Sequence, residues 1–130
     1  MDEKFTEATT NRPQGNRTLD TPLVSIDLSL FIAQIKEEEQ WKKTDRNAIT
    51  IFKSLVMRIV LIALHKGAEM KPHTTKGVIS VQVIEGEMQF VTDNQTVILS
   101  AGQMLVLEEG ILHSVLARTE TVFLLTLTNS

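Results

Sequence analysis

The feature that most constrains this fold is a series of short apolar runs separated by evenly spaced turn signals. From residue 67 to residue 110, successive signals lie eight to ten residues apart. They are Lys66-Gly67, Lys76-Gly77, Glu85-Gly86, Asp93-Asn94, Ala101-Gly102 and Glu109-Gly110. These intervals leave no room for the crossover helix that joins parallel strands. The spacing therefore predicts an all-β fold, a sandwich or barrel of antiparallel strands, over about residues 48–128.

Upstream of the strands, one segment has the period of a helix instead. Four large apolar residues recur three or four positions apart and share one helical face. They are Leu28, Phe31, Ile32 and Ile35. Asp27 precedes them and can cap the exposed amides of a first turn. We therefore expect one N-terminal α-helix over about residues 28–41, with Trp41 at its end packing against the barrel wall.

The first 21 residues are polar and include Pro13 and Gly15. A segment with so little apolar surface cannot offset the entropy of ordering. We expect a flexible tail over residues 1–21, a single domain over residues 22–130, and a short strand at Leu23–Ile26.

Composition excludes several classes of function. The net charge is −3 and the basic residues are scattered, which argues against a nucleic-acid partner. Cysteine is absent, so the chain has no disulfide, thiolate metal site or cysteine nucleophile, as suits a cytoplasmic protein. The longest apolar run, residues 55–64, is far shorter than the roughly 20 residues that span a membrane. No glycine-rich phosphate loop or nucleophile elbow is present.

The segment 78–84 predicts which side chains face the interior. Ile79, Val81 and Val83 alternate with a second, mixed set. The first set suits a barrel interior, because alternate residues of a strand point to opposite faces. The second set consists of Val78, Ser80, Gln82 and Ile84. A mixed face suits contact with another subunit, so we expect a homodimer.

Two histidines frame these strands in a pattern that resembles the cupins. The first cupin motif reads glycine, five residues, His-x-His, three or four residues, glutamate, six residues, glycine. Here Gly67, His73 and Gly86 fall on its positions. The second motif reads proline-x-glycine, two residues, histidine, and here Gly110 and His113 match it. The chain is similar to a small single-domain cupin of the RmlC-like jelly-roll superfamily, over about residues 55–128. The resemblance implies a double-stranded β-barrel with a site in its mouth.

The same comparison implies an incomplete set of metal ligands. The second histidine of the first motif is Thr75, and its glutamate is Ile79 or Ser80. Only His73 and His113 remain of the four ligands that the family uses. A catalytic metal site generally needs three protein donors. The third donor would have to come from elsewhere, with His65, Glu69, Glu87 and Glu109 as the candidates.

We therefore expect a protein that binds a small molecule in the barrel mouth without a tightly bound metal. Its pocket would be lined by His73, Thr75 and His113, over an apolar floor including Ile79 and Val81. One alternative is a cupin enzyme, an oxygenase or isomerase, with iron, manganese, nickel or zinc held by the two histidines, or a metal-free epimerase-like catalyst. Another is a stand-alone sensor or interaction module.

Overall fold

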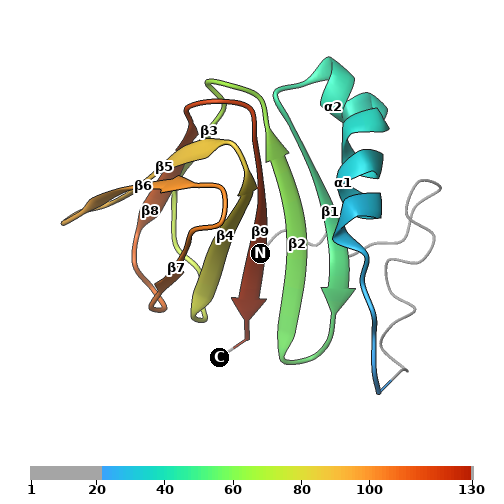
Figure 1. Ribbon diagram of the computed structural model, residues 1–130. Helices are drawn as coiled ribbons and strands as arrows, with labels where there is room; N and C mark the ends of the chain where they lie inside the picture. The colour runs from blue at the N-terminus through green and yellow to red at the C-terminus, as the bar shows by residue number, and fades with distance from the viewer. Residues whose placement is uncertain (1–21, 130) are drawn as a thin grey trace.

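The computed structural model describes residues 22–129 as two antiparallel sheets with two short helices on one side (Figure 1). One sheet has the strand order β1-β2-β9-β4-β7 and the other β3-β8-β5-β6. The strands are β1 Arg46–Lys53, β2 Met57–Leu64, β3 Glu69–His73, β4 Ile79–Glu85, β5 Glu87–Thr92, β6 Thr96–Ser100, β7 Met104–Leu107, β8 His113–Ala117 and β9 Thr121–Thr128. This is a jelly-roll sandwich, so the prediction of an antiparallel all-β fold is confirmed.

The helical segment begins where the sequence predicts and is broken once. The carboxylate of Asp27 accepts hydrogen bonds from the amides of Ser29 and Leu30 and caps α1, Leu28–Glu37. At Glu38 the backbone is extended, with φ −76° and ψ 149°, and a second helix, α2, follows over Glu39–Lys43. The prediction of one continuous helix over residues 28–41 is therefore wrong at Glu38.

A buried asparagine accounts for the end of α1. The side-chain amide of Asn47 on β1 donates to the carbonyl of Ile35 at 3.0 Å and to the carboxylate of Glu38 at 2.9 Å. The last carbonyls of a helix have no partner within the helix, so a donor from the sheet satisfies one of them. These two bonds hold the end of α1 on β1.

The segment before α1 also differs from expectation. Residues 23–27 belong to no strand, so the prediction of a strand at Leu23–Ile26 is wrong. Leu23 is exposed, whereas Ile26 packs against the apolar cluster under the helices without pairing with a strand. The flexible tail expected for residues 1–21 lies outside the described residues. Among residues 22–129, no helix is long and apolar enough to cross a membrane.

Each face of the five-stranded sheet packs against a different set of side chains, and the helices cover its outer face over β1 and β2. Its inner face packs against the second sheet and includes Ile79, Val81 and Val83, as predicted. Its outer face packs against α1 and α2 through Ile35 and Trp41. Ile84, expected to face another subunit, packs instead against this helix-side cluster.

Candidate functional site

The two histidines of the sequence pattern are direct neighbours across β3 and β8. His73 ends β3 and His113 begins β8, and the antiparallel register pairs them. Pro72 has no amide hydrogen, and the ladder is irregular between Met70 and His73. Gly110, with φ +77°, lies in the turn before β8. Residues 40 positions apart in the chain thus meet at one end of the second sheet.

The imidazole rings of these residues are in contact. Their centroids lie 4.4 Å apart, and the ring planes are inclined by 56°. The His113 ring also stacks on Phe90 of β5, with centroids 5.3 Å apart and an interplanar angle of 11°. His113 is 4% exposed, whereas His73 is exposed. The pair therefore joins a buried ring to one that solvent reaches.

Backbone carbonyls fix the tautomer of both rings. Nδ1 of His73 donates to the carbonyl of Lys71 at 2.8 Å, and Nδ1 of His113 donates to that of Ile111 at 2.8 Å. A carbonyl only accepts, so in each neutral ring the proton is on Nδ1 and the lone pair is on Nε2. Within the described part of the chain, neither Nε2 atom has a hydrogen-bond partner. The site therefore offers two aromatic nitrogen acceptors.

Burial keeps His113 neutral. Desolvation lowers the pKa of His113, the hydrogen bond to Ile111 opposes this shift, and the charge of His73 lowers the pKa further. A buried imidazole loses the hydration that stabilises its charged form, which is why desolvation acts in this direction. At neutral pH the buried member of the pair is an acceptor and not a cation.

Of the other predicted lining residues, Thr75 lies in a loop, whereas Ile79 and Val81 lie in the core. The hydroxyl of half-buried Thr75 donates to the carbonyl of Gly77 at 3.2 Å, and the Thr75 carbonyl accepts from the Gly110 amide at 2.9 Å. Thr75 thus ties the β3–β4 loop to the loop that leads into His113. Ile79 and Val81 are buried in the sandwich core. Their role as the floor of a pocket stays a prediction.

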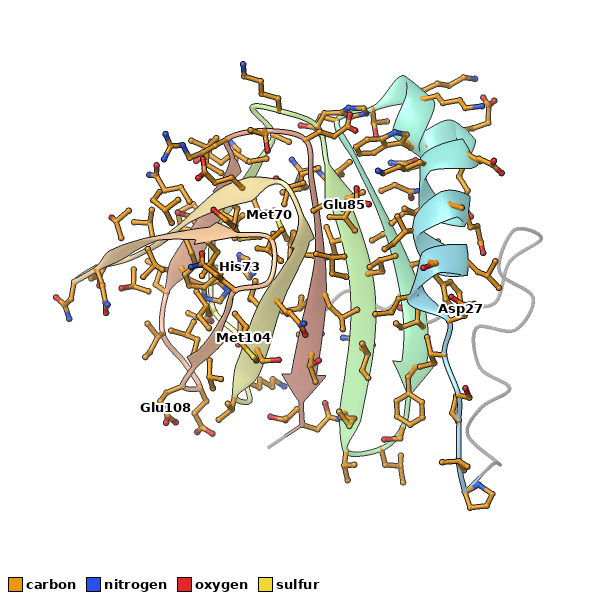
Figure 2. All side chains as sticks on the ribbon, viewed as in Figure 1. Asp27, Met70, His73, Glu85, Met104 and Glu108 are labelled. Carbon is orange, nitrogen blue, oxygen red and sulfur yellow. The ribbon has the colours of Figure 1, made fainter. Side chains whose placement is uncertain are left out.

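The remaining candidate donors do not complete a metal site. In residues 22–129, no three His, Asp or Glu side chains gather in a way that would hold an ion. The ring of His65 stacks on Trp41, Glu87 pairs with Arg118, and Glu69 is exposed. Exposed Glu108, in the β7–β8 loop beside Glu109, is labelled well away from His73 in Figure 2. Two imidazoles alone do not fit the three-donor site of a mononuclear metal enzyme.

Phe90 is the contact of the histidine pair that sequence reasoning missed. It lies on β5, and its contact with His113 depends on the pairing of β5 with β8. That pairing puts Phe90 opposite Val115 and Thr92 opposite His113. A single sequence does not specify which strands pair, so no signal in the chain pointed to this aromatic side chain.

The structure is thus a jelly roll with two histidines at the paired ends of β3 and β8. The chain belongs to the cupin domain family, whose match covers residues 60–128. No curated protein matches the sequence. The expected resemblance is thereby confirmed, and with it the cupin fold.

Solved structures agree on the fold. A cupin superfamily protein from Desulfitobacterium hafniense is 15% identical with a TM-score of 0.68, over 75% of this chain and 86% of that one. A conserved protein of unknown function from Streptococcus pyogenes is 22% identical with a TM-score of 0.68, over 82% and 88%. Salicylate 1,2-dioxygenase from Pseudoaminobacter salicylatoxidans, in a structure with gentisate, is 18% identical with a TM-score of 0.70, over 78% of this chain and 32% of the enzyme. At these identities the likeness concerns the fold alone.

Proposed function

We propose that this small cupin-domain protein binds an uncharged small molecule through the Nε2 atoms of His73 and His113, without a bound metal. The observation that carries the proposal is the contact between the two rings, with both Nδ1 atoms held by backbone carbonyls. Fixed rings present their free acceptors in a constant direction. A ligand that uses both acceptors therefore meets a site whose orientation is set before binding.

The acceptors also indicate the chemistry of the ligand. A lone pair on Nε2 accepts a hydrogen bond from a hydroxyl, amide or amine group. No carboxylate is paired with either ring to neutralise a cationic ligand, as judged from the described residues. Neutral His113 likewise offers an anion no charge. We expect a neutral molecule with two neighbouring donors, such as a vicinal diol, whose apolar part packs beside the Phe90–His113 stack.

Two measurements test the proposal. The first is elemental analysis of the purified protein, for which we expect less than stoichiometric iron, manganese, nickel and zinc. The second is a thermal-shift screen of neutral hydroxylated compounds followed by calorimetry. A ligand at 100 times its dissociation constant should stabilise the fold by about 2.7 kcal/mol.

Variants separate binding by this pair from other effects. His73→Gln and His113→Gln should each abolish the ligand-dependent shift. His65→Gln is the matched control, because His65 lies against Trp41 and Glu120, outside the pair, and this variant should retain the shift. Stoichiometric metal that is lost in both site variants would overturn the metal-free proposal. A hydroxylated ligand that binds both site variants as tightly as the wild type would exclude the histidine pair as the binding site.

A further inference from the structure

Strand β7 is the least protected edge of either sheet. It comes last in the order β1-β2-β9-β4-β7, so β4 is its single strand neighbour within residues 22–129. An edge strand presents unpaired backbone donors and acceptors, and proteins usually block such edges with charges, proline or bulges. The four residues of β7, Met104–Leu107, are all uncharged and apolar.

Each of the other edges carries charges, a proline or polar ends. β3 contains Pro72 together with Glu69 and Lys71. β1 begins with Arg46, ends with Lys53 and has an irregular register between Thr50 and Phe52. β6 has no charge or proline, but it is polar at both ends, with Thr96 and Ser100. β7 has none of these features, and its short length of four residues is its one safeguard.

The side chains on the outer face of β7 are exposed as well. Met104 lies opposite Gln82 and Val106 opposite Ser80, so all four share the outer face of the sheet. Met104 is 53% exposed and Val106 is 64% exposed. The helices do not cover them, because α1 and α2 pack on β1 and β2, at the opposite edge of the sheet from β7 (Figure 1). In Figure 2, Met104 is correspondingly labelled far from Asp27 at the start of α1.

We propose that β7 pairs antiparallel with β7 of a second copy of this chain, so that two five-stranded sheets become one continuous sheet. A second copy is the occupant that this edge fits, because a twofold axis brings an uncharged strand against its own equivalent without opposing like charges. Backbone hydrogen bonds would satisfy the free edge. The exposed side chains would pack across the axis.

The alternation of side chains restricts the register. Directly opposite residues in an antiparallel pair point to the same face. A twofold axis through Leu105 places Met104 of each copy opposite Val106 of the other copy. This register buries both exposed side chains of both copies and leaves Leu105 and Leu107 on the inner face, where they already pack against the sandwich core.

Light scattering coupled to size exclusion tests the dimer on the full chain. At micromolar concentration we expect a dimer of the 14.6 kDa chain. Val106→Lys and Met104→Lys should each shift the molecule to a monomer, because they place charges across the axis. Leu55→Lys is the matched control: Leu55 is 92% exposed in the β1–β2 turn, and its variant should remain dimeric. Far-UV circular dichroism checks that all three variants are folded.

A monomeric wild type at micromolar concentration would overturn the proposal, and so would a folded Val106→Lys variant that stays dimeric. Disulfide cross-linking tests the register. The chain has no cysteine of its own, so any disulfide must form between the introduced residues. Under mild oxidation, the double variant Met104→Cys/Val106→Cys should form a covalent dimer, whereas Val106→Cys alone should not. Efficient cross-linking of the single variant would place the axis at Val106 and contradict the Leu105 register.

Discussion

His113 is a titratable ring in an apolar setting. It begins β8, stacks on buried Phe90 and is almost fully buried. The neutral form of the ring suits this setting, because Nδ1 donates a hydrogen bond to the Ile111 carbonyl and the ring buries no charge. Protonation would place a cation beside Phe90 and against the ring of His73. The same feature that makes His113 an acceptor therefore makes the fold sensitive to acid.

The pH dependence of stability follows from the direction of this shift. The folded-state pKa of His113 is below its ordinary value of about 6.5, so the unfolded chain binds the proton more readily. The His113 contribution is complete above about pH 6.5 and is lost as the pH falls towards the folded-state pKa. Asp45, whose pKa is lowered mainly by its hydrogen bond with Arg46, loses its contribution at more acid pH.

We expect the wild type to lose more free energy of unfolding between about pH 7.5 and about pH 5.5 than His113→Gln does. Urea unfolding at the two pH values measures this difference. An NMR titration of the imidazole protons should also give His113 a midpoint below 6.5. Equal losses in the two proteins, or a midpoint above the ordinary value, would contradict the assignment.

At the scale of elements, Asn47 joins α1 to the sheet. It is 3% exposed, and its side chain donates to Ile35 and Glu38 and accepts from the Ala48 amide at 2.9 Å. Removing a buried group that satisfies a backbone carbonyl leaves that carbonyl without a partner. The attachment of the helix therefore depends on one amide as well as on the apolar cluster around Ile35 and Trp41.

We expect Asn47→Ala to lower the free energy of unfolding by about 1–3 kcal/mol. Gln40→Ala is a suitable control, because Gln40 donates to Thr44 at 3.2 Å on an exposed surface, and its loss should cost less than about 0.5 kcal/mol. Denaturant titration of both variants gives the comparison. A loss for Asn47→Ala no larger than that for the control would show that the apolar cluster alone holds the helix.

The elements also show what a single sequence can predict. Strands were predictable because turn dipeptides and alternation are local signals, and Ile79, Val81 and Val83 face the interior as the alternation requires. The helix break at Glu38 was not predictable, because it involves a contact with Asn47, which is nine residues away on another element. The stack of Phe90 on His113 was not predictable either, because it also depends on contact between separate elements. The pairing of His73 with His113 was suggested by family motifs, and the register of β3 with β8 supplies its geometry.

At the scale of the whole molecule, one sheet separates two apolar clusters. β2 contributes Val60, Ile62 and Leu64 to the cluster between the sheets, and Leu61 and Ala63 to the cluster under the helices. β9 does the same, with Phe123 on the inner face and Val122 on the outer one. Because the same strands carry both sets, loss of either cluster exposes the backbone that supports the other. The two clusters should therefore unfold together.

The single tryptophan makes this cooperativity measurable. Trp41 belongs to the helix-side cluster, so its fluorescence reports that cluster, whereas far-UV circular dichroism reports mainly the strands. Ile35→Ala, on the helix side, and Met88→Ala, between the sheets, both remove fully buried side chains and should each cost about 2–5 kcal/mol. In both variants the fluorescence and dichroism transitions should stay superimposed along the denaturant axis. If Trp41 fluorescence in Ile35→Ala changed at lower denaturant than the dichroism, the helices would form a separate unit. The shared strands would then not couple the two clusters.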